Sequence, residues 1–220
     1  MAAFFTLPCR NFHSLFDSCL LSPYTFTIMY THFNYSFQKE IVTIHPGEYY
    51  VSSEDIYIST VLGSCIAVAL HDPQLKIGGL NHYMLPGTFK GFNTADKSGR
   101  YGVYAMELLI NEMLKNGARR KNLRAKVFGG GNVLNSANKV GSNNARFAIQ
   151  YLETEQIPID AQDVESDIAR KVLFEPITGR VYLKKLSHTV IKKVEDIEVK
   201  HLQKISKKDV YGDFTLFENL

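Results

Sequence analysis

Apolar and polar residues alternate along most of the chain with periods that predict strands and helices of ordinary length. Runs rich in Val, Ile and Tyr predict strands in GEYYVSSEDIYIST, with a polar break at Ser52 to Asp55, and in LRAKVF. The stretch KIGGLNHYMLP predicts another strand, ended by Pro86. The apolar run IAVAL (66–70) is too short for its period to separate a strand from a buried helix.

Two segments have the apolar period of an amphipathic helix. The first, YAMELLINEMLKNG, follows a segment at 91–102 that is predicted to be a polar loop, and it stops at its glycine. The second is predicted from about Asn144 to Glu155, with Ser142 or Asn143 as its cap. Three further strands, IPIDAQDV, KVLFEP and RVYLKK, follow, the last two joined by the turn PITG. The pattern indicates an α/β or α+β fold with a mixed sheet flanked by helices.

The composition divides the chain into three parts. Residues 1–40 are rich in aromatic side chains and nearly free of charge, and they lack the basic start and apolar core of a secretory signal. They are either an extension that packs on the domain or a partner, or a stretch absent from a protein that starts at Met29. Residues 41–186 form the predicted domain, and 187–220 form a charged, weakly amphipathic tail that either docks or remains a solvated helix.

Charge and cysteine content narrow the class of protein. The formal net charge of +3 comes from scattered side chains, so it does not indicate a nucleic-acid-binding surface. No apolar window approaches the roughly 18 residues of a membrane span. Three cysteines without metal-type spacing fit a reducing cytosol better than a disulfide framework. Two of them, Cys9 and Cys19, lie in the first part, so the domain holds only Cys65.

The stretch STVLGSCIAVALHD carries the candidate chemistry. A cysteine is nucleophilic as the thiolate, and the LGSC turn offers backbone N–H groups that would stabilise developing negative charge. His82 is the natural base if its strand lies beside the turn, and hydroxyl groups at Ser59, Thr60 and Ser64 could orient its ring. Cysteine is also among the most often buried residue types, so spacing alone leaves Cys65 open between nucleophile and core residue.

Two other patterns are weaker. His71 and Asp72 could be combined with Cys65 and His82 as a metal site, but the chain has none of the tight ligand pairs of zinc sites, and turn residues are the preferred interpretation. The triple glycine at 129–131 is not followed by the Lys-Ser/Thr of a phosphate loop, and it is interpreted as a tight turn beside the active-site cleft.

The motifs together resemble the CheD family of chemoreceptor glutamine deamidases. They cover about residues 43–186 in the family's order, and the most specific pair is LGSC with NHYMLP, which places Cys65 and His82 seventeen residues apart. The motifs are STVLGSCIAVALHDP, IGGLNHYMLP, GRYGVYAMELLINEMLKNGA, LRAKVFGGGNVL and VGSNNARFAIQYLETEQIPIDAQDV. The fold that the resemblance implies is a mixed α/β sandwich related to toxin-type cysteine deamidases.

The resemblance also implies roles for individual residues. The family's nucleophile falls on Cys65, its base on His82, and its threonine on Ser59, with Thr60 as the fallback if the register differs by one. Candidates for the oxyanion site and cleft are Gly63, Ser64 and Gly130. At DVESDIARKV, Glu165 and Ser166 replace the Gly-Gly that the family usually has.

The implied activity is that of a protein-glutamine glutaminase in the cytoplasm, working through a thioester and needing neither metal nor organic cofactor. The implied partners are methyl-accepting chemoreceptors, as substrate, and a CheC-type phosphatase. The alternatives are a regulatory binding partner of that phosphatase with weak or no catalysis, and a different cysteine hydrolase acting on small amides.

Overall fold

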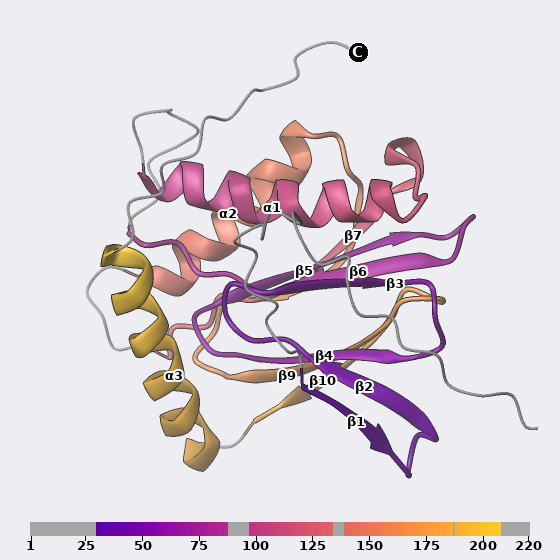
Figure 1. Ribbon diagram of the computed structural model, residues 1–220. Coiled ribbons are helices and arrows are strands. Elements are labelled where there is room, and N and C mark those ends of the chain that lie inside the picture. The colour runs from indigo at the N-terminus through magenta and orange to yellow at the C-terminus, as the bar shows by residue number, and fades with distance from the viewer. Residues whose placement is uncertain (1–29, 88–96, 134–138, 187, 208–220) are drawn as a thin grey trace, which may run out of the picture.

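Two mixed five-stranded sheets stack face to face in the computed structural model, which describes residues 30–87, 97–133, 139–186 and 188–207 (Figure 1). The helix-covered sheet has the order β3-β6-β5-β7-β8 and carries α1 and α2 on its outer face, and the open sheet has the order β1-β2-β4-β9-β10. The strands are β1 (Tyr30–Asn34), β2 (Lys39–Thr43), β3 (Tyr49–Ser52), β4 (Tyr57–Leu62), β5 (Ile66–Asp72), β6 (Ile77–Asn81), β7 (Arg124–Gly129), β8 (Ile159–Val164), β9 (Arg170–Glu175) and β10 (Arg180–Lys185). The helices are α1 (Lys97–Lys115), η1 (Arg120–Asn122), α2 (Val140–Thr154) and α3 (His188–Lys207).

The expected mixed sandwich with flanking helices is confirmed. Within it, β2 and β4 are parallel, as are β7 and β8, and the other pairs are antiparallel. The ambiguous IAVAL run is a strand, because β5 lies at the centre of a sheet that is covered by helices on one side and by the open sheet on the other. Burial on both faces removes the alternation that would otherwise mark a strand.

Both helices begin earlier than predicted. The expected loop at 91–102 is wrong for residues 97–102, which form the first turns of α1, and residues 91–96 lie outside the described ones. Gly102 is buried there, and a Cβ on it would lie 2.5 Å from the Phe147 ring of α2, so the glycine lets α1 approach α2. α2 starts at Val140 rather than at 144, after Lys139 in a left-handed conformation.

Two hydrophobic cores lie between the layers of the fold. The first lies between the helices and the helix-covered sheet, with Ile66, Val68 and Leu70 of β5 facing α1 and α2. The second lies between the two sheets and holds the alternate residues of the same strand, Ala67 and Ala69, with Cys65 just before it. This alternation places Cys65 on the face of the helix-covered sheet that looks toward the open sheet.

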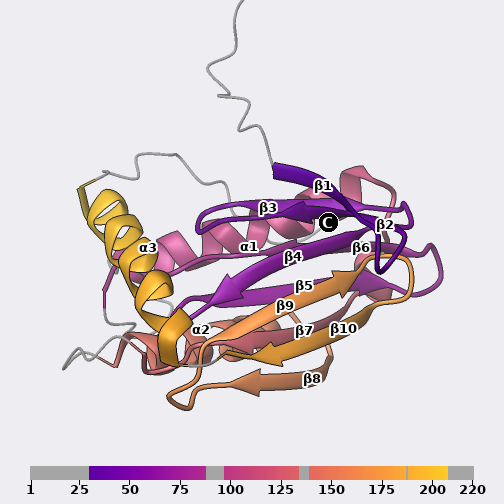
Figure 2. The same cartoon turned by 90° about the horizontal axis from the view of Figure 1, so that it is seen from below.

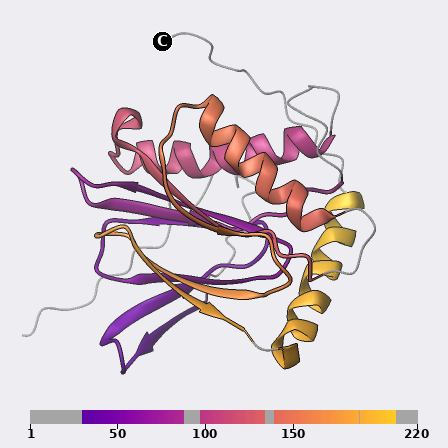
Figure 3. The same cartoon turned by 180° about the vertical axis from the view of Figure 1, so that it is seen from behind.

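α3 stands across one end of the sandwich, beside the end of β4 and the start of β5 (Figures 1 and 2). Seen from behind, it again covers the edge of both layers (Figure 3). The tail that the sequence left open between docking and solvation therefore docks on the domain over residues 188–207. No helix within the described ranges has both the length and the apolar character needed to cross a membrane.

The N-terminal part belongs to the sandwich from Tyr30 onward. β1 pairs antiparallel with β2 and forms the edge of the open sheet. Residues 1–29, with Cys9 and Cys19, lie outside the described residues.

Candidate active site

The LGSC turn connects β4 of the open sheet to β5 of the helix-covered sheet, so it lies where the two sheets meet. Just after it, Ile66 and Tyr83 form an antiparallel bridge in which each N–H donates to the other's carbonyl, at 2.9 and 3.0 Å. The bridge brings the segment after β6 alongside the start of β5, and Cys65 and His82 then share the face toward the open sheet. The structure brings the two predicted residues together, since Cys65, His82 and Glu198 have polar atoms within 4.8 Å of one another.

Thr60 orients the histidine. Its hydroxyl donates to the Ile44 carbonyl at 2.9 Å and lies 2.7 Å from His82 Nδ1. A hydroxyl has only one proton to donate. Because the Thr60 hydroxyl donates that proton to the Ile44 carbonyl, the Thr60 oxygen accepts a hydrogen bond from the Nδ1–H of His82. The Nε2 atom then carries the free lone pair, and it has no hydrogen-bond partner although it is buried. This is the tautomer that a base for Cys65 requires.

Ser59 does not contact His82 in this arrangement. Ile58, Leu62 and Thr60 alternate on the inner face of β4, whereas Tyr57 belongs to a separate cluster on the outer face. Ser59 shares the face of Tyr57, because successive side chains of a strand point to opposite sides. The orienting role that the resemblance placed on Ser59 is therefore reassigned to Thr60, the fallback, by a shift of one residue.

The triple glycine at 129–131 supports the LGSC turn through backbone hydrogen bonds. The N–H of Gly130 donates to the Cys65 carbonyl at 2.7 Å, and that of Gly131 donates to the Gly63 carbonyl at 2.8 Å. Gly129 has a φ of 106°, and a Cβ on it would clash with the Cys65 carbonyl oxygen. The triple glycine lies in a tight turn beside the site, as expected. Gly130, which was a candidate for the oxyanion site and cleft, hydrogen-bonds to the backbone of the LGSC turn.

Asn144, which the sequence did not single out, holds two loops together. Its side-chain amide donates to the Ser64 carbonyl at 2.7 Å and accepts from the N–H of Leu85 at 2.8 Å. It is fully buried on α2. One side chain therefore fixes the Cys65 turn relative to the segment that carries His82.

Glu198 of α3 is the second residue that the sequence did not reveal. Its Oε1 accepts from the N–H of Gly63 at 2.8 Å and of Cys65 at 3.0 Å. Its Oε2 accepts from the N–H and the hydroxyl of Ser64, at 2.8 and 2.6 Å. Three successive backbone donors and one hydroxyl thus converge on one carboxylate beside the thiol. These are the donors that an oxyanion site needs.

Burial determines the charge states of Cys65 and His82. It raises the pKa of the Cys65 thiol well above its usual value, and the charge and hydrogen bond of Glu198 raise it further. Burial lowers the pKa of His82 to about 3, and the nearby His201 and His45 lower it as well. At neutral pH the thiol and the imidazole are therefore both uncharged while Glu198 is in place.

The same three side chains are a possible set of metal ligands, the only group of three or more that the described ranges contain. The donor set does not favour this use. Both oxygens of Glu198 already accept two hydrogen bonds each, so their lone pairs are engaged by the Gly63–Cys65 turn. We therefore describe the cluster as a buried thiol and a buried imidazole beside an anion site that the Glu198 carboxylate fills.

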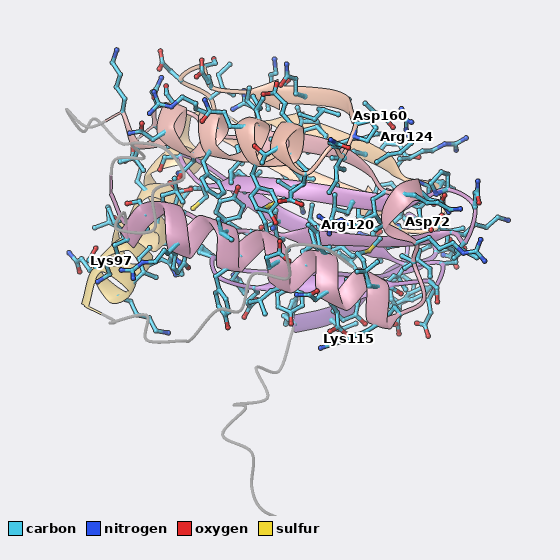
Figure 4. All side chains as sticks on the ribbon, turned by 90° about the horizontal axis from the view of Figure 1, so that it is seen from above. Asp72, Lys97, Lys115, Arg120, Arg124 and Asp160 are labelled. Carbon is cyan, nitrogen blue, oxygen red and sulfur yellow. The ribbon has the colours of Figure 1, made fainter. Side chains whose placement is uncertain are left out.

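The earlier alternative of a metal site with His71 and Asp72 does not fit the geometry. Both residues lie at the far end of β5, and Figure 4 shows Asp72 with Arg124 and Asp160 at the end of the molecule opposite α3. The Asp72 carboxylate accepts from the backbone N–H groups of Gln74, Leu75 and Arg119 and from the Asn122 amide. Asp72 ends β5, and its carboxylate holds the turn that follows the strand.

Comparison with known proteins supplies relatives over most of the chain. The sequence model of the family described as CheD chemotactic sensory transduction matches residues 84–185, starting two residues after His82. A Shewanella oneidensis protein named probable chemoreceptor glutamine deamidase CheD 1 is 47% identical over 82% of this chain and 89% of its own length. Proteins named probable chemoreceptor glutamine deamidase CheD are 44% identical in Methylobacillus flagellatus, over 84% of this chain and 94% of theirs, and 47% identical in Xanthomonas campestris pv. campestris, over 83% and 91%.

Proposed function

This chain belongs to the CheD family, and we propose that it is a protein-glutamine deamidase that converts glutamine side chains of chemoreceptors to glutamate in chemotaxis. The observation that carries the proposal is the convergence of Cys65, His82 and three backbone N–H groups at one point. The names of the relatives supply the substrate class, and the site supplies the chemistry.

The geometry supports a covalent route. His82 Nε2 takes the proton of the Cys65 thiol, and the thiolate attacks the δ-carbonyl carbon of the glutamine. The carbonyl oxygen becomes an oxyanion that accepts hydrogen bonds from the N–H groups now bound to Glu198. The imidazolium returns its proton to the departing nitrogen, so ammonia leaves and a thioester remains.

Water completes the cycle. His82 removes a proton from a water molecule that attacks the thioester carbon, the carbon–sulfur bond breaks, and the proton returns to the Cys65 thiolate, which restores the thiol. The net change is one glutamine and one water to one glutamate and one ammonia. Thr60 keeps the ring in the required tautomer during both steps. The route needs no metal or organic cofactor.

The resemblance adds a setting for this reaction. Its substrate would be the helical cytoplasmic region of methyl-accepting chemoreceptors, which places the enzyme in the cytoplasm, and a CheC-type phosphatase would be a partner. Glu198 favours one alternative, a binding partner of that phosphatase with weak catalysis, because the carboxylate occupies the donors that a substrate oxyanion needs.

Replacement of the nucleophile tests the proposal. We expect wild-type protein incubated with a recombinant receptor cytoplasmic region to release ammonia and to raise the mass of receptor peptides by about one dalton per converted glutamine. Cys65→Ala removes the nucleophile and should abolish both signals. Ammonia release that persists in Cys65→Ala would exclude the thioester route, and binding of the phosphatase with no ammonia from any variant would favour the binding role.

A further inference from the structure

The side chain that occupies the anion site is itself a glutamate. Its carboxylate is the group that hydrolysis of a glutamine would leave at this position, and it accepts all four hydrogen bonds that the Gly63–Cys65 turn directs into the site. It comes from residue 198, more than 130 positions away along the chain.

The buried face of α3 places the Glu198 side chain in the site. Val194, Glu198 and Ile205 are buried, and Leu202 packs on the core between the sheets, a spacing of three or four residues that marks one side of a helix. Asp196 and Lys200 on the other side are exposed. Glu198 is thus a charged position within an apolar stripe, and a charge is buried at such a position only with partners.

The fit leaves no room for another ligand. Cys65 is 0% exposed and Glu198 is 1% exposed. A Cβ on Gly63 would lie 2.9 Å from Glu198 Oε2, so the glycine permits the carboxylate to approach the turn. A pocket of about 50 Å³ reaches His82, but Cys65 is not among the residues that line it. A receptor glutamine therefore reaches the thiol only after α3 has moved.

We propose that α3 is an autoinhibitory segment whose Glu198 occupies the active site as a mimic of the reaction product. The closed form shields Cys65 from solvent and substrate, and displacement of α3 opens the site. The covering of Cys65 stands on the structure alone, whereas the description of Glu198 as a product mimic rests on the proposed deamidase function.

The rate at which Cys65 is alkylated measures how far α3 shields the thiol, and the measurement needs no substrate. Val194→Glu together with Ile205→Glu places charges on the inner face of α3 and should expel it without changing the domain. We expect iodoacetamide to label the Cys65 peptide at least about tenfold faster in this double variant than in wild type, because labelling follows the open population. Mapping by peptide is required, since the chain also contains Cys9 and Cys19.

Asp196→Ala is the matched control, because it removes an exposed acidic side chain from the same helix. It should label at the wild-type rate. Equal labelling of wild type and the double variant, with circular dichroism showing that both are folded, would overturn the proposal. A deamidation rate on receptor fragments that is the same in both proteins would also overturn it.

Glu198→Gln tests the mimicry directly. The variant presents an amide at the product position, so the enzyme should hydrolyse its own residue 198, with a mass gain of about one dalton that is absent when Cys65→Ala is added. If residue 198 stays glutamine while receptor glutamines are converted, the side chain does not occupy the product position. If the double variant labels faster but nothing is deamidated, the proposed function fails and the covering by α3 stands.

Discussion

Ser59 and Thr60 are adjacent hydroxyl residues on one strand, and the pleat of β4 decides between them. Thr60 lies on the inner face, where it bonds both His82 and the Ile44 carbonyl, and Ser59 lies on the outer face. A shift of one residue along β4 therefore separates Thr60, which positions His82, from Ser59, which faces away from it.

Thr60→Val removes this hydroxyl with little change in volume. Without it the imidazole loses the group that holds the Nδ1–H tautomer, and we expect kcat for deamidation to fall by roughly tenfold or more. Steady-state kinetics on receptor fragments check the result. Thr60→Ser should restore most of the activity, and Ser59→Ala should retain it. A larger loss in Ser59→Ala than in Thr60→Val would contradict the assignment.

The approach of Cys65 to His82 was predictable from the sequence, because the family resemblance pairs the two residues and the strands beside them, β5 and β6, are neighbours. Glu198 was not, because a single glutamate in a charged tail has no signal of its own. Only its position within the stripe of Val194, Leu202 and Ile205 indicates burial, and that stripe is weak beside the charges around it. Asn144 was hidden in the same way, since a polar residue on a helix is usually exposed.

At the scale of elements, the segment after β8 has an unusual backbone. Glu165 and Ser166, which stand where the family resemblance leads us to expect Gly-Gly, have φ values of 63° and 65°. The turn nevertheless forms, because the N–H of Glu165 donates to the Gly129 carbonyl at 2.8 Å and the N–H of Asn132 donates to the Ser166 carbonyl at 2.7 Å. Two residues without glycine's freedom are held in the left-handed region to support the glycine turn behind Cys65.

Ser166→Gly relieves this strain. The left-handed conformation costs a non-glycine residue about 1–2 kcal/mol, and the greater freedom of glycine in the unfolded chain offsets part of the gain. We expect the free energy of unfolding to rise by about 0.5–1 kcal/mol, measured by urea denaturation. Ser166→Ala keeps the strain and serves as the control. A stability gain in Ser166→Ala of the same size would show that backbone strain is not the cause.

The elements themselves were largely predictable. The short strands from residue 49 to 62 and from 159 to 185 have clear signals, and the structure places them there. The start of α1 was missed, because Ser98, Gly99 and Gly102 give no apolar period, although all three are buried. Their burial depends on the packing of α1 against α2, which a local pattern does not contain.

At the scale of the whole molecule, the candidate site joins three parts of the fold. Cys65 and His82 come from the helix-covered sheet, Thr60 comes from the open sheet, and Glu198 comes from α3. Local sequence signals predict the sheets but not how the two sheets face each other or where α3 docks. The catalytic geometry is therefore a property of the assembled sandwich.

The buried His82 makes stability depend on pH. Burial, then His201 and His45, lower its pKa to about 3, and Thr60 holds its Nδ1–H. The unfolded chain takes up a proton near the ordinary value of about 6.5, so its stability contribution is present above that pH and is lost as pH falls toward 3. His82→Gln should flatten this part of the curve of unfolding free energy against pH. An unchanged slope below about pH 6 would contradict the assignment of a buried neutral imidazole.

The central claim, that Cys65 hydrolyses glutamine side chains, is tested most directly by mass spectrometry of receptor fragments in ¹⁸O-labelled water. The Val194→Glu, Ile205→Glu variant should be used so that α3 does not limit access. We expect each converted glutamine to gain about three daltons in labelled water and about one dalton in ordinary water, because the new carboxylate oxygen comes from water. The same variant with Cys65→Ala should give no gain. Conversion that persists without Cys65, or its absence from the variant in which iodoacetamide labels Cys65 rapidly, would contradict the account.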